Sequence, residues 1–199
     1  MKRTILCVAV ISFLPLSLFA PAASAQKKSG KPRLDRSSRS ATEARNVEYL
    51  TKQIRKELVT IPSFGVFDWL EGNVGPDGEV QLRGEVVRPI TKSDAEKRVE
   101  KIEGVEKLVS RIEILPLSSF DDQLRQRVFR ALFNQNSPLF YYGRATIPSI
   151  HIIIRNGRCT LKGVVANKTD ADVAYIRARG VEGLFEVTNE LTVERSSKK

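Results

Sequence analysis

The sequence has few of the residues from which metal and nucleophilic sites are built. Its 199 residues include two cysteines and one histidine. Cys7 lies in an apolar N-terminal stretch, so Cys159 is the single thiol of the remaining chain and has no internal disulfide partner. His151 stands between two isoleucines, without a second histidine or a cysteine cluster. We therefore expect a plain strand histidine, an inert thiol, no metal, no cofactor and no catalytic residues.

The part of the chain that is expected to fold also lacks net charge. The chain carries +10, but +2 falls in residues 1–25, +5 in residues 26–46 and +3 in the final RSSKK. Residues 47–194 are therefore balanced. A domain built around nucleic acid carries Lys and Arg on its folded face, so we expect no nucleic-acid partner.

The first 25 residues have the pattern of a secretory signal. Lys2 and Arg3 precede an apolar run, and Ala23-Ser24-Ala25 supplies a small-x-small cleavage site. The run contains Pro15 and is shorter than the ~20 residues of a spanning helix. We predict a cleaved signal peptide over residues 1–25 and an exported, periplasmic or envelope-associated protein; an uncleaved anchor is the alternative. No lipid-attachment cysteine follows the run.

Two short segments are expected to lie outside the folded units. Residues 26–46 are rich in Lys, Arg and Ser, which predicts a basic disordered linker. Order is expected to begin near Ser40, which has capping-box spacing to Glu43. Residues 195–199 form a basic C-terminal tail.

The part of the chain that is expected to fold contains an internal repeat. The stretch GEVQLRGEV, from Gly78, returns as GRCTLKGVV, from Gly157, at an offset of 79 residues. In both copies apolar residues alternate with polar ones, which predicts a strand with one buried face. Glycines recur at matching positions, namely Gly84 and Gly163, then Gly104 and Gly183. We interpret these four glycines as structural and expect the last two to cap helices that end there.

Each copy predicts the order helix, strand, strand, helix, strand. The first helix of each copy has apolar residues at helical intervals and stops before Pro62 or Pro138. The predicted fold class is α+β, with two tandem αββαβ units, each a small mixed three-stranded sheet with two helices packed on one face. The expected domains are residues 47–116 and 117–194, joined by a bridge short enough to make the units touch.

The motifs LRGEV and LKGVV, each followed by a helix and a glycine-apolar step (EGVEKLVSRIEI and EGLFEVTNELTV), resemble the BON domain (bacterial OsmY and nodulation). The resemblance covers both copies. It implies an exported bacterial envelope protein whose dual-domain relatives are associated with osmotic stress, envelope integrity and phospholipid binding.

One segment has more large side chains than an ordinary connecting loop. The second copy inserts NSPLFYYGRATIPS between helix and strand, which places large residues together in an expected loop: Leu139, Phe140, Tyr141, Tyr142 and Arg144. Either several of them pack against the neighbouring unit, or they form an exposed aromatic-basic patch for a membrane or a partner.

We therefore expect a non-enzymatic binding module of the bacterial envelope. By resemblance its ligand is an anionic phospholipid surface, contacted peripherally, and its role is envelope integrity or osmotic stress tolerance. The alternative is a protein–protein scaffold that docks on an envelope protein or secretion complex.

Overall fold

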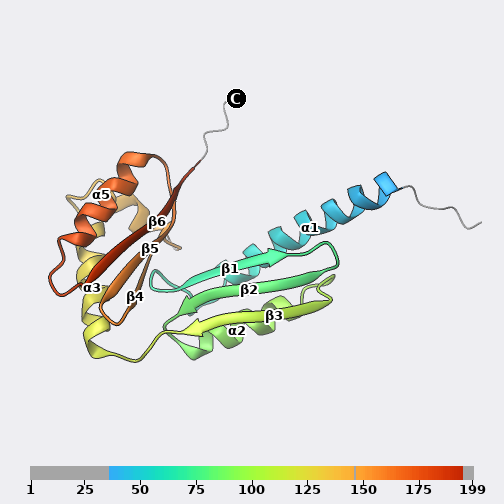
Figure 1. Cartoon of the computed structure of the whole chain (residues 1–199), viewed down its shortest axis with the longest axis horizontal. Coiled ribbons are helices and arrows are strands. Elements are labelled where there is room, and N and C mark those ends of the chain that lie inside the picture. Colours follow the sequence, from blue (N-terminus) through green and yellow to red (C-terminus); the bar gives the residue numbers. More distant parts are fainter. Residues whose placement is uncertain (1–35, 146, 195–199) are drawn as a thin grey trace, which may run out of the picture. The chain divides into compact units, whose positions relative to one another are not determined.

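The computed structural model describes residues 36–145 and 147–194 (Figure 1). The first repeat consists of α1 (Arg36–Val59), β1 (Trp69–Val74), β2 (Glu79–Val86), α2 (Pro89–Glu100) and β3 (Lys107–Ile114). The second repeat consists of α3 (Ser119–Phe133), α4 (Phe140–Arg144), β4 (Ile150–Arg155), β5 (Arg158–Val165), α5 (Lys168–Arg179) and β6 (Glu186–Val193). The predicted tandem α+β fold is confirmed.

Each repeat contains one mixed sheet of three strands. The first two strands form an antiparallel hairpin, and the third pairs in parallel with the second. A parallel neighbour requires a crossover, and α2 and α5 supply it. The helices of each repeat cover one face of its sheet, as Figure 1 shows for α1 and α2 behind β1–β3. The opposite face of the sheet in the first repeat is therefore free to carry polar side chains.

Helix α1 begins earlier than expected. Its buried face is made by Leu50, Ile54 and Leu58, as the spacing predicts. The helix itself starts at Arg36, so the part of the expected linker from residue 36 to residue 46 is helical. No glycine or proline lies between Asp35 and Ile61, so nothing local interrupts the helix.

The two cores are separate clusters of buried apolar side chains. The first is built from α1, α2 and the sheet β1–β3, and the second from α3, α5 and the sheet β4–β6. The short bridge is not where the repeats meet. Instead Val66 and Phe67, from the loop after α1, pack against the core of the second repeat. The backbone N–H of Ile152 donates to the Val66 carbonyl at 2.8 Å, so this loop adds a ladder bond to the edge of β4.

Two glycines bring neighbouring strands close together. At Gly84 (φ 151°) and Gly163 (φ 128°), an added Cβ would lie 2.0 Å from a carbonyl oxygen, that of Trp69 and of Ser149 respectively. No side chain fits there. Both copies of the motif therefore have glycine where the backbone of the neighbouring strand leaves no room for a side chain.

The other glycine pair is not at the helix ends. Gly104 and Gly183 have φ of 95° and 94°, which favours glycine. However, α2 ends at Glu100 and α5 at Arg179, so the expectation that these glycines cap the helices was wrong. They lie in the turns that connect α2 to β3 and α5 to β6.

Candidate functional site

The segment from Leu139 to Arg144 is mostly a short helix, α4, rather than a loop. Leu139 is fully buried in the core of the second repeat. The hydroxyl of Tyr142 donates to Asp170 Oδ2 at 2.6 Å and accepts from the Ala166 N–H at 2.9 Å. Burial, and next the bond to Asp170, raises the pKa of Tyr142. These contacts anchor the segment to its own repeat.

The remaining side chains of this segment face outward. Tyr141 is 79% exposed, and its ring meets the half-buried Phe140 ring edge-on, with centroids 6.0 Å apart. The exposed Arg144 guanidinium lies 5.5 Å from the Phe140 ring centroid, within the range of a cation–π contact. The presented surface is therefore Phe140, Tyr141 and Arg144, which we name the α4 patch.

Gly143 lets α4 lie close to α3. A Cβ there would meet the Phe133 side chain at 2.6 Å. These contacts tie both sides of the α4 patch to its own repeat, and a patch held in place loses less entropy when a partner binds.

His151 is a packing residue at the contact between the repeats. It is buried, with ring centroids 5.4 Å from Phe64 and 5.2 Å from Trp69, and its Nδ1 lies 3.2 Å from the Gly65 carbonyl oxygen. Burial lowers the pKa of His151. The aromatic surroundings account for the residue as a neutral strand histidine.

Cys159 lies on the buried face of β5, at the position that Val80 occupies in the first repeat. Burial raises its pKa to about 12, so the thiol stays protonated and unreactive. Within residues 36–145 and 147–194, no group of three or more His, Cys, Asp or Glu side chains is placed to hold a metal ion.

Two polar features have no counterpart in the expectations drawn from the sequence. Asp121 is 1% exposed, and its two oxygens accept from the Asn156 and Gly157 N–H groups, each at 2.8 Å. An acidic residue at the start of a helix is common, so the sequence did not indicate this role for Asp121. Arg155 forms ion pairs across the repeats, to Glu85 at 2.9 Å and to Glu113 at 2.7 Å.

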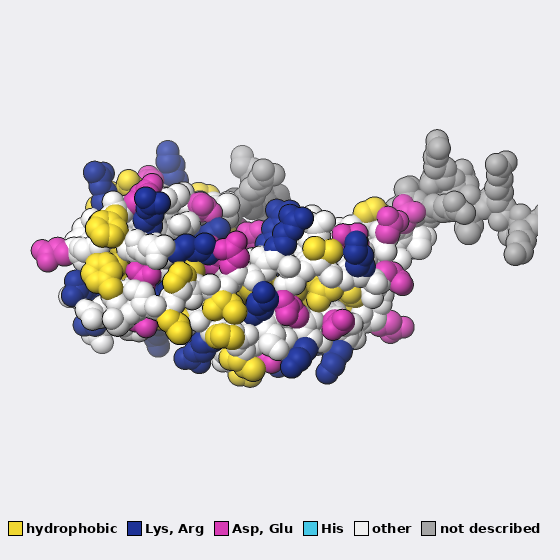
Figure 2. All heavy atoms as spheres, turned by 60° about the horizontal axis from the view of Figure 1, so that its bottom comes forward, with side chains coloured by type: hydrophobic (Ala, Val, Ile, Leu, Met, Phe, Trp, Pro, Cys, Tyr) yellow, Lys and Arg dark blue, Asp and Glu magenta, His cyan; other side chains and the backbone are white. Residues whose placement is uncertain are grey.

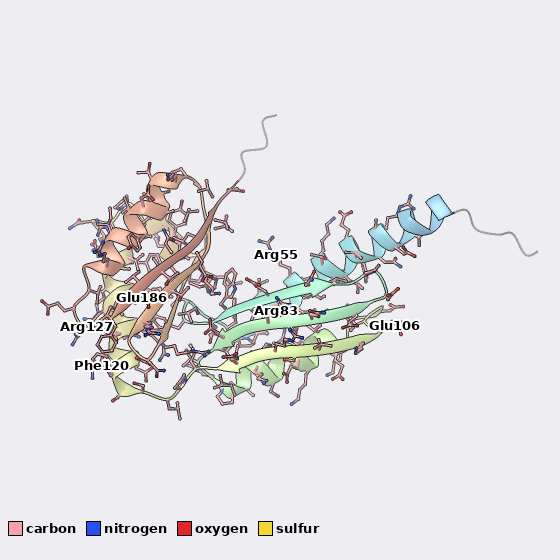
Figure 3. All side chains as sticks on the ribbon, viewed as in Figure 1. Arg55, Arg83, Glu106, Phe120, Arg127 and Glu186 are labelled. Carbon is pink, nitrogen blue, oxygen red and sulfur yellow. The ribbon has the colours of Figure 1, made fainter. Side chains whose placement is uncertain are left out.

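Several large apolar side chains in and next to the second repeat are exposed. Leu117 is 94%, Phe120 46% and Phe185 79% exposed. Phe120 and Phe185 both lie beside the hairpin turn at Gly157, where an added Cβ would be 2.6 Å from the Phe185 ring and 3.6 Å from the Phe120 ring. Figure 2 shows hydrophobic side chains gathered over this repeat, with charges of both signs among them, and Figure 3 marks Phe120 on α3. Isolated phenylalanines far apart in the sequence give no signal for such a surface.

No helix among the described residues is long and apolar enough to cross a membrane. Two solved structures are similar to the chain at low identity. The first is CdsD, a structural protein of the type III secretion system of Chlamydia trachomatis, at 15% identity, with 74% of this chain and 94% of that chain covered and a TM-score of 0.28. The second is the C-terminal domain of the same protein, at 14% identity, with 73% and 97% covered and a TM-score of 0.28. No curated protein matches.

The family comparison agrees with the repeats. The BON domain pattern matches residues 73–116 and 120–195, which together span more than half of the chain. The matched segments contain the hairpin of the second repeat, both crossover helices and both positive-φ glycine pairs, and the first begins near the end of β1. BON domains are non-catalytic binding domains of envelope-associated proteins. From the duplicated fold and these two matches, the chain belongs to the BON domain family.

Proposed function

We propose that this protein is an exported, non-enzymatic module of the bacterial envelope that docks peripherally on anionic phospholipid surfaces. The α4 patch is the observation that carries the proposal, because it presents an aromatic side chain that is 79% exposed, Tyr141, beside an arginine. By resemblance to dual-domain relatives, the docking serves envelope integrity or osmotic stress tolerance.

The chemistry of the α4 patch suits a membrane interface. Tyrosine has an apolar ring and a polar end, so it favours the headgroup level, where both are satisfied. The Arg144 guanidinium is placed to donate to a lipid phosphate. The basic residues from position 26 onward add diffuse attraction, at most ~1 kcal/mol per residue before screening by salt. Neither part binds strongly alone, so we expect reversible binding that weakens with salt.

Flotation on phosphatidylglycerol-containing vesicles tests the proposal. A Phe140→Ser/Tyr141→Ser variant is expected to lose most of its binding, and Tyr49→Ser is the matched control. Tyr49 is 51% exposed on α1, so its substitution removes a similar aromatic from another surface. A truncation that begins at Arg36 keeps α1 and separates the contribution of the basic residues before it.

Circular dichroism of each variant checks that it is folded. Equal flotation of the wild type and the Phe140→Ser/Tyr141→Ser variant, both folded, would exclude the α4 patch as the docking site. Poor flotation of every form at low salt would remove lipid binding altogether.

A protein–protein scaffold is the second candidate, and the exposed Leu117, Phe120 and Phe185 side chains favour it. Exposed apolar side chains that lie close together are typical of protein interfaces, and Phe120 and Phe185 both lie beside Gly157. Crosslinking in the native cell is expected to yield one stoichiometric protein partner whose capture depends on Phe185. If the crosslinked product is lipid and Phe185→Ser leaves it unchanged, the scaffold proposal is excluded.

A further inference from the structure

The uncovered face of the first sheet carries two arginines side by side. Arg83 lies on β2, the central strand (Figure 3), and Arg111 lies on β3, and the register pairs their Cα atoms directly. Both side chains are exposed. Adjacent strands are about 4.8 Å apart, so two guanidinium groups extend from neighbouring positions of one face.

The second repeat has opposite charges at the same position. Lys162 and Glu190, each at the offset of 79 residues, are paired by the register and form an ion pair of 3.0 Å. Directly opposed like charges destabilise a sheet, whereas opposite charges stabilise it. The first repeat therefore keeps a repulsive pair where its own second copy accommodates an attractive one.

The two arginines are not neutralised by carboxylates of the described residues. Arg83 Nη2 has a long hydrogen bond to Gln81 Oε1, at 3.4 Å, and Arg111 has no ion pair. On its other side Arg83 has Glu71 of β1 as its register partner, and within the described residues these two side chains form no ion pair. Two adjacent guanidinium groups that no carboxylate bonds are the arrangement expected of a site for an anion that is not part of the chain.

The acidic residues nearby already have donors. Glu71 accepts from Trp69 Nε1 at 2.8 Å. Glu85 and Glu113 are held by Arg155, at 2.9 and 2.7 Å. These bonds draw the three carboxylates toward other groups and leave Arg83 and Arg111 available.

Arg83, Arg111 and Trp69 line an open hollow of about 530 Å³, together with Glu71, Glu85 and Glu113 and with Arg155 and Lys162 of the second repeat. We propose that this hollow binds a phosphate group, held between the two guanidinium groups. The oxygens of a tetrahedral phosphate can accept from both arginines at once, whereas the two oxygens of a carboxylate are satisfied by a single bidentate arginine. The two arginines belong to the first repeat and the site does not require a membrane, so it goes beyond the proposed function.

Titration of the folded chain with glycerol phosphate tests this site. At constant ionic strength, the NMR signals of Trp69 Nε1–H and of the Arg83 and Arg111 side chains are expected to shift and to saturate. Chloride and acetate are the control anions. Arg111→Glu recreates the opposite-charge pair of the second repeat and is expected to weaken phosphate binding at least about tenfold, since it removes charge-assisted bonds.

A second variant protects the test against misfolding. Arg111→Gln removes one guanidinium without adding a charge, and Arg130→Gln, on the exposed surface of α3, is the control for a lost positive charge. Saturable shifts that Arg111→Gln weakens and Arg130→Gln leaves unchanged support the site. Shifts that do not saturate, or that chloride and acetate reproduce, overturn it.

The same variants separate the two sources of phosphate. Binding of soluble glycerol phosphate, with vesicle flotation unaffected by Arg111→Gln, assigns the site to a soluble phosphoester. Loss of flotation in Arg111→Gln assigns it to a lipid headgroup. The Phe140→Ser/Tyr141→Ser variant should titrate with glycerol phosphate like the wild type, so failure of the α4 patch and failure of this site give different results.

Discussion

The two repeats share their backbone requirements and differ in what they do with their surfaces. Gly84 and Gly163 both allow a close approach to the preceding strand, and both have positive φ. On the open face of the sheets, by contrast, Arg83 opposes Arg111, whereas Lys162 is paired with Glu190. The fold constrains the positions where no side chain fits, while the exposed positions are free to differ between the copies.

The hairpin turns of the two repeats differ in length and in what stabilises them: the strand register ends at Val74 and Val80 in the first repeat and at Arg155 and Arg158 in the second. In the first repeat the turn is held by backbone bonds, with Gly75 N–H donating to the Glu79 carbonyl at 2.8 Å and Gly78 N–H to the Gly75 carbonyl at 3.2 Å. In the second repeat the buried carboxylate of Asp121 accepts from both turn N–H groups. The second turn therefore depends on a side chain from a helix distant in sequence.

The largest effect is expected at the shared glycines. Gly163→Val places a Cβ 2.0 Å from the Ser149 carbonyl oxygen at a φ of 128°. The strand must shift or the pairing must break, so we expect a loss of about 3 kcal/mol or more in the free energy of unfolding. Urea denaturation measures it. Gly180→Ala, at φ −76° and with ordinary contacts of 3.6 and 3.7 Å to an added Cβ, is the control and should be neutral. Equal effects at both glycines would contradict the steric explanation.

The next effect concerns the unequal turns. Asp121→Ala removes two charge-assisted bonds and leaves two turn N–H groups without their acceptor, so we expect a loss of about 3 kcal/mol. The comparison variant is Asp77→Ala, which removes an exposed carboxylate from the turn of the first repeat. Thermal unfolding should show a large shift for Asp121→Ala and a small one for Asp77→Ala. Similar shifts would mean that the two turns are stabilised alike.

A smaller effect is expected from pH. Burial lowers the pKa of His151 below its ordinary 6.5, although hydrogen bonds to the Gly65 and Asp68 backbone oppose the shift. As the pH falls, the unfolded chain therefore binds a proton before the folded chain does. The contribution of His151 to stability is complete above about pH 6.5 and is lost as the pH falls toward the folded pKa, at no more than about 1.4 kcal/mol per pH unit.

His151→Gln should abolish this part of the pH dependence while carboxylate titrations remain. Urea denaturation between roughly pH 7.5 and pH 5 gives the free energy of unfolding of both forms, and their difference is the contribution of His151. Parallel pH profiles for the two forms would show that His151 is not buried as a neutral residue.

The smallest effect is expected at the thiol. Cys159 takes the place of Val80 on the same buried face, so Cys159→Val should change stability by less than about 1.5 kcal/mol. In the wild type, a thiol reagent should react slowly with the folded chain and rapidly in denaturant, because the protonated buried thiol is a poor nucleophile. Rapid labelling of the folded protein would contradict the alignment of the two repeats.

Much of the fold could be predicted because its signals are local. Alternation around Leu82 and Leu161 gives the central strands, and the apolar spacing of Leu50, Ile54 and Leu58 gives the buried face of α1. The ends of the helices were harder to predict from the sequence. The polar composition after residue 26 indicated disorder, yet the absence of helix-breaking residues allows α1 to extend back to Arg36.

The candidate site could be predicted only in part. Four large residues in a row marked residues 139–142, but their sequence does not state which of them point inward. Leu139 and Tyr142 point toward the core of their own repeat and Tyr141 points outward. Contacts with α3, with α5 and at Gly143 decide which side chains point inward. The exposed Phe120 and Phe185 left no pattern because 65 residues separate them.

The sequence by itself determined the duplication and the order of elements in each copy, because both depend on residues close together in the chain. Tertiary structure alone decided which charges meet. Arg155 reaches two glutamates of the other repeat, Asp121 reaches a distant turn, and Arg83 is left beside Arg111. Such encounters depend on strand register and on the packing of loops, and neither is written in the local pattern of any one segment.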